Sequence, residues 1–147
     1  MFNDRNIRTA QKSLRHLYFN HREYTDVFLI NGSPQERRRD VEEIIQVGYD
    51  PRIVLCSLQY TDEVKDSFKY FTQKGYFIYL HWLNPGYKDQ SSYGDSLNLI
   101  PILLTYNSLV GQRSGKIDPT TRTEEIKEYI YNWAKKNQLI KLLNSTK

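Results

Sequence analysis

Short apolar runs and helical stripes alternate along the first two thirds of the chain. Residues 27–30 and 53–58 are mostly apolar, a pattern typical of strands that are buried on both faces. Residues 76–83 alternate aromatic and aliphatic side chains and predict a third strand. The segments between these strands show apolar residues at helical spacing. The pattern therefore predicts an α/β protein in which strands alternate with helices.

Both intervening helices have recognisable ends. Ser33 can cap the first helix, with Pro34 at its first position and Glu36 placed to complete a capping box. Gly48 is expected to end this helix, because glycine accepts the left-handed conformation common after a helix. The second helix is expected over residues 61–75, with an apolar stripe on its inner side.

Near the N-terminus, Leu14, Leu17 and Tyr18 lie at helical spacing in an otherwise polar segment. We therefore expect an amphipathic N-terminal helix, which forms a helical extension over residues 1–25 ahead of an α/β domain over residues 26–147. The apolar stripe of this helix could also mediate self-association of the chain into a homo-oligomer.

The last third of the chain predicts a hairpin and a closing helix. Residues 100–106 are interpreted as a fourth strand with Pro101 at its start, where a missing backbone N–H is tolerated. A two-residue Asn-Ser turn leads into a fifth strand over residues 110–114, and a final helix is expected over residues 121–143. Helical crossovers join parallel strands and a hairpin joins antiparallel ones, so this order predicts a mixed sheet with helices on both faces.

This element order resembles the thioredoxin fold. The most specific local likeness lies in the segments LIPILLTY, residues 99–106, and VGQRSG, residues 110–115, which resemble the family's proline-led strand, hairpin and glycine-ended strand. The resemblance implies a three-layer sandwich around one mixed central sheet, with a cis peptide bond before Pro101. It also implies a partner-binding groove where the family has its active-site face. That groove would be formed by Tyr60, Thr61, Asp62, Ile100 and Pro101.

The chain departs from the thioredoxin family in its thiols. The segment that would carry the family's Cys-x-x-Cys turn reads YTDEV, residues 60–64, and the chain has a single cysteine, Cys56. Thiol–disulfide exchange needs an attacking thiolate and a second thiol that resolves the mixed disulfide. Cys56 also lies within an apolar run, where burial raises the pKa of a thiol and makes it unreactive. We therefore expect a redox-inactive, thioredoxin-like domain.

Composition limits the number of domains, the cellular location and the cofactors that we expect. The 147 residues suit one domain, and the formal net charge of +4 makes it mildly basic. Uncharged apolar runs are too short to cross a bilayer, and no secretory segment is recognisable at the start. Together with the single cysteine, these features predict a cytoplasmic protein without a membrane partner. The three histidines show no metal-site spacing, so neither a metal nor a cofactor is expected.

Six basic residues form two clusters in the sequence. They are Arg37, Arg38, Arg39, Arg113, Lys116 and Arg122. These residues are interpreted either as solvated charges that guard the surface or as a contact surface for phosphate groups or an acidic partner. The first cluster follows residues 31–33, which occupy the position of a phosphate loop after a strand. Against phosphate binding there, Glu36 lies where the anion would sit.

The leading functional prediction is a binding or adaptor domain without enzyme activity, which contacts a protein partner through the predicted groove. Two alternatives stay open. One is an α/β enzyme that binds a nucleotide or a flavin phosphate with a degenerate phosphate loop. The other is a basic adaptor for nucleic acid, whose affinity would fall steeply with salt.

Overall fold

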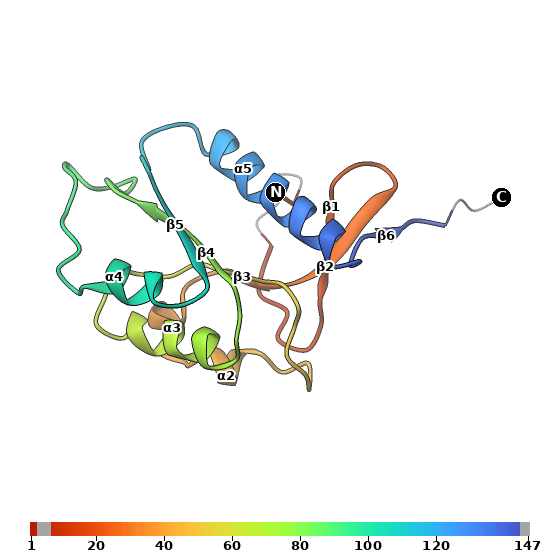
Figure 1. The fold of residues 1–147 in the computed structure, drawn as a ribbon, viewed down its shortest axis with the longest axis horizontal. Coiled ribbons are helices and arrows are strands. Elements are labelled where there is room, and N and C mark those ends of the chain that lie inside the picture. The colour runs from red at the N-terminus through yellow and green to blue at the C-terminus, as the bar shows by residue number, and fades with distance from the viewer. Residues whose placement is uncertain (3–6, 145–147) are drawn as a thin grey trace. The chain divides into compact units, whose positions relative to one another are not determined.

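The computed structural model describes residues 1–2 and 7–144. It confirms the predicted mixed α/β class, with helices and two sheets (Figure 1). The chain divides into two compact units. Unit 1 contains residues 1–57 and 120–147, and unit 2 contains residues 58–119.

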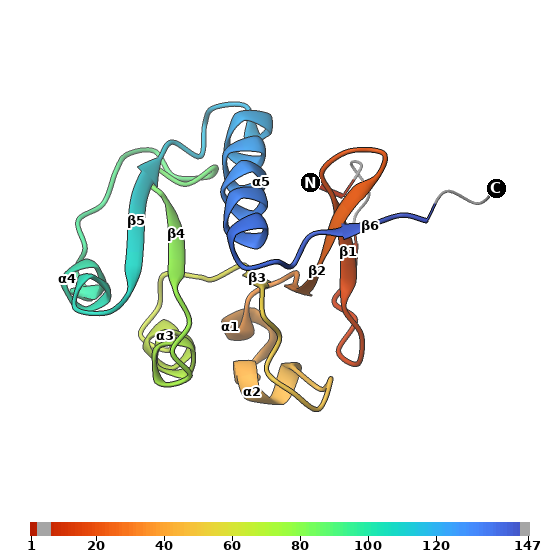
Figure 2. The same ribbon diagram turned by 45° about the vertical axis from the view of Figure 1, so that its right-hand side comes forward.

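Unit 1 is built on a sheet whose central strand is β2, Glu23–Ile30. Strand β1, Arg15–Tyr18, and the short strand β6, Lys141–Leu142, run antiparallel to the first part of β2. Strand β3, Val54–Cys56, runs parallel to its last three residues. The helix α5, Pro119–Lys136, lies along one side of β1 and β2 (Figure 2).

The contact between α5 and the sheet forms the core of unit 1. Leu17 of β1 and Val27 of β2 are fully buried and cluster with Ile130 and Ala134 of the helix. Ile53, just before β3, completes this buried cluster. Burial of aliphatic side chains between a sheet and a helix is the main favourable term for such a layer.

The predicted N-terminal helix is wrong, because β1 occupies its C-terminal part. Leu17 is fully buried while its neighbours His16 and Tyr18 are exposed, which is the two-residue period of a half-buried strand. The helix was predicted only from the spacing of Leu14, Leu17 and Tyr18, which does not by itself exclude a strand. The boundary expected after residue 25 falls inside β2, and the described residues before it contain the strand β1 and no helix.

The first predicted crossover helix is divided into two single turns, α1, Pro34–Arg37, and α2, Val41–Ile44. The predicted capping box is confirmed, since the Glu36 amide donates to the Ser33 hydroxyl at 3.1 Å and the Ser33 amide donates to the Glu36 carboxylate at 3.0 Å. Arg38 adopts a left-handed conformation, with φ of 51°, and this ends α1 after one turn.

Unit 2 combines a parallel pair of strands with two helices. The strands are β4, Ile78–Leu83, and β5, Ser108–Arg113, and they pair residue by residue along their whole length. The helices α3, Val64–Gln73, and α4, Leu99–Leu104, pack on this pair (Figure 2). Their shared core consists of Val64, Phe68, Leu99 and Leu103, packed against Leu58, Ile78, Leu80, Leu97 and Val110.

The predicted hairpin in the last third is wrong. Residues 99–104 form α4, and α4 lies on the crossover between the parallel strands β4 and β5. Pro101 lies in the first turn of α4, where a residue without a backbone N–H loses no helical hydrogen bond. The cis peptide bond of the described residues is Asn84–Pro85, so the bond before Pro101 is trans and the expected cis bond there is also wrong.

Two further expectations need correction. The strands form two sheets, one in each unit, where one mixed central sheet was expected. The closing helix ends at Lys136, and the chain then turns at Gln138, whose φ is 57°, into the strand β6. In the part of the chain that the structure describes, no helix has both the length and the apolar character that a bilayer span requires.

Candidate functional site

The candidate site is a hollow of about 720 Å³ in unit 2, at the carboxyl end of β4. In parallel α/β sheets, loops at this end of the strands commonly hold ligands. The loop over residues 84–98 and the segment just before α3 supply the remaining walls. The lining residues are Tyr60, Trp82, Leu83, Asn84, Asp89, Tyr93, Gly94, Asp95 and Ser96.

An aromatic pair forms one wall of the hollow. The rings of Tyr60 and Trp82 stack with 5.8 Å between their centroids and an interplanar angle of 12°. Ile78 and Leu80 lie on the same face of β4 as Trp82 and pack in the core of unit 2. Trp82 is the next residue on that face, so the core-facing side of the strand continues into the wall of the hollow.

Asp95 connects this aromatic wall to the start of α4. Its carboxylate accepts a hydrogen bond from the Tyr60 hydroxyl, and it also accepts from the backbone amides of Leu99 at 3.0 Å and Ile100 at 2.8 Å. These amides belong to the first turn of α4 and have no partner within the helix. The Tyr60 hydroxyl also accepts from the Leu97 amide at 2.9 Å. One carboxylate therefore positions both Tyr60 and the helix.

These contacts set the charge state of the site. Burial alone would raise the pKa of Asp95, but the hydrogen bonds from Tyr60, Ile100 and Leu99 outweigh it and hold the pKa below its ordinary value. Burial, followed by the hydrogen bond to Asp95, raises the pKa of the Tyr60 hydroxyl. At neutral pH the hollow therefore contains an ionised carboxylate beside a neutral phenol.

The Asn84 side chain connects the start of the loop to Tyr93, nearer its end. It is 6% exposed, and its side chain accepts from the Tyr93 amide and donates to the Tyr93 carbonyl, both at 2.7 Å. Its backbone carbonyl accepts from the Gln112 side chain at 3.0 Å, and its amide donates to the Arg113 carbonyl at 2.8 Å. Residues 84 and 93 are thereby held together, and both strands anchor the loop.

A second turn packs against the base of the loop. The Gly115 amide donates to the Pro85 carbonyl at 2.7 Å, and the Lys116 ammonium donates to the Tyr87 carbonyl at 2.6 Å. Asp89 accepts from the Gly86 amide at 2.9 Å, which closes the tip of the loop. Hydrogen bonds thus hold the loop on both sides, while the Tyr87 side chain is 78% exposed.

The structure brings two residues of the predicted groove close to the hollow. Tyr60 lines the hollow, and the Ile100 amide is held by the same Asp95 carboxylate that holds Tyr60. Thr61, Asp62 and Pro101 are not among the lining residues.

Sequence reasoning missed most of the lining. The pattern over residues 76–83 predicts a strand but no site at Trp82, and residues 84–98 carry no predicted role. The available signal was the concentration of Tyr, Asp, Asn and Ser in that loop directly after a strand.

The six predicted basic positions are divided between the two units. Arg113 and Lys116 belong to unit 2, whereas Arg37, Arg38, Arg39 and Arg122 belong to unit 1. The Arg37 guanidinium turns back onto its own loop, where it donates to the Gly32 carbonyl at 3.1 Å and to the Thr9 hydroxyl at 2.8 Å. Arg39 donates to the Glu43 carbonyl at 2.8 Å. The segment over residues 31–33, expected as a possible phosphate loop, is thus contacted by the Arg37 side chain of the protein itself.

The structure also bears on two other kinds of chemistry, thiol reactivity and metal binding. Burial raises the pKa of the Cys56 thiol to about 12, so this thiol stays protonated at neutral pH. Within residues 1–2 and 7–144, no three histidine, cysteine or acidic side chains come together in a way that could hold a metal ion.

Removing the carboxylate of Asp95 tests its structural role. We expect Asp95→Asn to destabilise unit 2 by about 1 kcal/mol at pH 7, because the amide leaves one of the two helix N–H groups without an acceptor. The lowered pKa means that the stabilisation from Asp95 is present above its unfolded pKa of 3.8 and is lost as the pH falls through the folded pKa. The variant should therefore lose less stability than the wild type between pH 5 and pH 2.

Denaturation followed by the fluorescence of Trp82, the tryptophan of unit 2, measures this effect. Asp62→Asn removes an exposed carboxylate from the same unit and serves as the control, with an expected change below about 0.5 kcal/mol. Equal acid sensitivity of wild type and Asp95→Asn would contradict the role of this carboxylate.

Comparisons with known proteins identified no relative of the chain. No protein-family model, no curated protein and no solved structure matches the chain at a significant level.

Proposed function

We propose that unit 2 is a protein-binding module whose hollow takes an arginine or lysine side chain of a partner. The observation that carries this proposal is the composition of the lining. Two carboxylates, Asp89 and Asp95, stand beside the stacked rings of Tyr60 and Trp82, and no lysine, arginine or histidine is among the described residues that line the hollow. The hollow therefore favours a cationic group.

The chemistry of a guanidinium or ammonium group fits such a lining. A cation gains from the face of a tryptophan or tyrosine ring and from hydrogen bonds to a carboxylate. The lowered pKa of Asp95 supports its negative charge at neutral pH. Lys116, on the neighbouring turn, donates to the Tyr87 carbonyl and does not line the hollow. Arginine is expected to bind more tightly than lysine, because its planar guanidinium stacks on rings and pairs with carboxylates at once.

The rim supports a protein partner in preference to a free amino acid. Of the residues that line the hollow, Tyr93 is 61% exposed and Tyr60 and Leu83 are each about 40% exposed. Tyr87, in the same loop, is 78% exposed. Tyrosine and tryptophan are over-represented among the residues that dominate protein interfaces. A partner chain that inserts a basic side chain could cover these rings with its flanking residues.

Binding rather than catalysis is supported by the nature of the acidic groups. Asp95 accepts several internal hydrogen bonds and has a lowered pKa, so it is a poor proton acceptor at neutral pH. From the thioredoxin resemblance we retain only the expectation of a binding domain without dithiol chemistry. The proposal does not depend on the hairpin or on the cis bond that the resemblance implied.

Matched peptides test this proposal. We expect a fluorescent peptide with a central arginine in a Gly/Ser background to bind more tightly than the same peptide with lysine, and much more tightly than with citrulline, which has arginine's shape without its charge. Trp82→Ala should weaken binding by about tenfold or more. Asp89→Asn, which still accepts from the Gly86 amide, should weaken it by about threefold to tenfold.

Fluorescence anisotropy titrations give these affinities, and circular dichroism checks that each variant is folded. Tyr18→Ala in unit 1 is the control and should leave peptide affinity unchanged. Equal binding of the arginine and citrulline peptides, or unchanged affinity in a folded Trp82→Ala protein, would reject the proposed site.

A further inference from the structure

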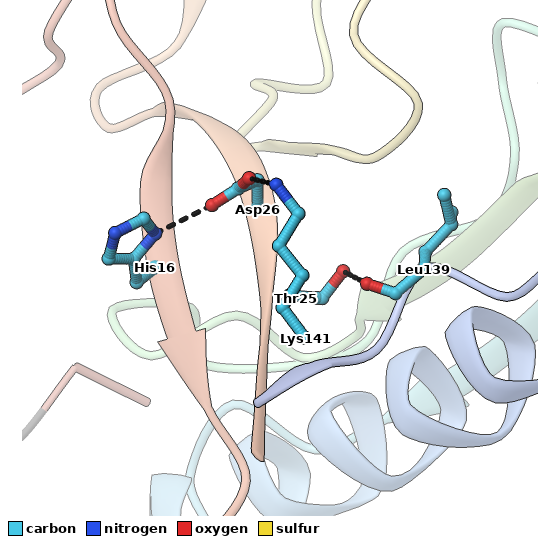
Figure 3. Close-up of polar contacts among 5 residues, drawn as sticks. All are labelled: His16, Thr25, Asp26, Leu139 and Lys141. Atoms are coloured by element: carbon cyan, nitrogen blue, oxygen red, sulfur yellow. Dashed lines mark hydrogen bonds and ion pairs between the residues drawn. The ribbon is translucent and has the colours of Figure 1, made fainter. Parts of the chain in front are cut away.

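A second surface lies in unit 1, on β1, β6 and the first part of β2, on the face opposite the cluster that these strands bury with α5. Strand residues alternate between two faces, so Leu17, Thr25 and Val27 point one way and His16 and Asp26 point the other. Figure 3 shows this division, with the Thr25 hydroxyl donating to the Leu139 carbonyl while His16 and Lys141 both approach Asp26. The outer face is defined here by His16, Tyr18, Tyr24, Asp26 and Lys141.

Three aromatic rings gather on this outer face. Tyr18 and Tyr24 are directly opposite each other across the two strands, with 5.6 Å between their ring centroids. The His16 ring lies 4.5 Å from Tyr24 and 6.1 Å from Tyr18. The His16 side chain is 51% exposed and Tyr18 is 41% exposed. Solvent therefore reaches a cluster of rings mounted on regular strands.

The polar groups beside the rings hold the His16 ring in place and leave no unpaired carboxylate on the outer face. His16 Nδ1 lies 2.6 Å from the Asp26 carboxylate, which fixes the orientation of the imidazole ring. The Lys141 ammonium pairs with the other oxygen of Asp26, so the single carboxylate of the outer face is neutralised within the protein. Lys141 is opposite Tyr24 in the β2–β6 register, and its side chain is 55% exposed.

The charge of the chain is concentrated in this unit. Unit 1 carries fifteen lysines and arginines against eleven acidic residues, whereas unit 2 carries six of each. All of the formal net charge of +4 therefore belongs to unit 1. A phosphate backbone is attracted by such a field, and a neutral or basic partner is not.

We propose that the outer face of unit 1 binds single-stranded nucleic acid, with bases stacked on Tyr18, Tyr24 and His16. Every base has a flat π-face, so exposed rings on a sheet recognise single strands with little dependence on sequence. A duplex keeps its bases paired and stacked and cannot offer those faces to the rings. The positive charge of unit 1 supplies the attraction for the phosphates, which rings alone would not provide.

Oligonucleotide binding tests this inference independently of the peptide site. The probes are fluorescent single strands of oligo-dT and oligo-U, each about ten nucleotides long, and a duplex of the same length. We expect both single strands to bind more tightly than the duplex, with affinity that falls as salt is raised. Tyr18→Ala should lower the affinity by about tenfold to a hundredfold, whereas Tyr18→Phe, which keeps the ring, should retain it.

Two further variants separate stacking from charge. His16→Ala removes a second exposed ring and should also weaken binding, which keeps the test decisive if Tyr18→Ala does not fold. Lys141→Gln leaves the Asp26 carboxylate of the outer face without its cation, and it should weaken binding more at low salt than at high salt. Trp82→Ala in unit 2 is the control and should leave nucleic-acid affinity unchanged.

Three results would overturn the inference. The first is the absence of single-strand binding at low salt, and the second is equal or tighter binding of the duplex. The third is unchanged affinity in a folded Tyr18→Ala or His16→Ala protein, which would leave the charge of unit 1 as the only source of attraction.

Discussion

Replacing Phe28 with alanine is expected to destabilise unit 1 by about 3–5 kcal/mol, the range for a fully buried aromatic side chain. Phe28 is completely buried in the central strand β2, where its amide donates to the Ile53 carbonyl at 2.9 Å and it pairs with Val54 of β3. Phe28 is the first residue of β2 that pairs with β3. A cavity left by its side chain would therefore lie where this parallel pairing begins.

The two tryptophans make this prediction measurable unit by unit. Trp133 belongs to unit 1 and Trp82 to unit 2, so their fluorescence can be separated in single-tryptophan proteins during urea denaturation. Leu142→Ala, at a side chain that is 66% exposed, is the control and should change stability by less than about 0.5 kcal/mol. A loss below about 1 kcal/mol for Phe28→Ala would show that this position is not part of a close-packed core.

Replacing Gly115 with alanine is expected to damage both the stability and the binding site of unit 2. A Cβ atom at Gly115 would lie 2.7 Å from the Tyr87 nitrogen, 2.8 Å from the Gly86 carbonyl carbon and 2.9 Å from the Pro85 oxygen. All three are backbone atoms, so no side-chain rotation relieves the overlap and the two chain segments must separate. We expect a loss of about 1–3 kcal/mol, and weakening of the hydrogen bond from the Gly115 amide to Pro85.

The binding consequence follows from the position of that hydrogen bond at the base of the loop. If the turn at Gly115 moves away from Pro85, Asp89 and Tyr93 are no longer held at their present positions on the wall of the hollow. We expect the affinity for the arginine peptide to fall by more than about tenfold, since small misplacements of positioned groups lose much of their interaction.

Gly94 offers a matched control for Gly115. It also lies on the hollow, but a Cβ atom there would meet no atom within 4 Å. Gly94→Ala should therefore remain close to the wild type in stability and keep most of the peptide affinity. If Gly115→Ala and Gly94→Ala behave alike in denaturation and in peptide titrations, the close packing of the two segments does not support the site.

The proposed peptide and nucleic-acid sites can be separated because they belong to different units. Trp82→Ala should affect peptide binding alone, and Tyr18→Ala should affect oligonucleotide binding alone. A chain that carries both activities would connect a basic protein segment with single-stranded nucleic acid. Loss of both activities in either variant would instead indicate global unfolding, which circular dichroism would reveal.

Local patterns predicted several elements correctly, because the physics behind them is local. The apolar runs correspond to β2 and β3, the aromatic alternation corresponds to β4, and the stripe after residue 61 corresponds to α3. The capping box at Ser33 needs only residues within one helical turn, and it is present as predicted.

The errors arose where distant residues decide between local alternatives. LIPILL is equally apolar as a strand or as a helix, and the helix forms where Asp95 supplies acceptors for its first amides and Leu99 and Leu103 meet the α3 side chains of the core. Likewise, the spacing of Leu14, Leu17 and Tyr18 fits a helix, but pairing of β1 with β2 imposes the period of two.

The sequence alone determined the α/β class, the lack of a second thiol and the net positive charge. Each of these depends only on composition or on contacts between near neighbours. The hollow could not be deduced in this way. Tyr60 and Asp95 are 35 positions apart and meet only because α3, β4 and the loop after it return the chain to the same place. The direction of β5 and the gathering of three rings on one face of β1 and β2 were likewise decided by strand pairing, which no local spacing specifies.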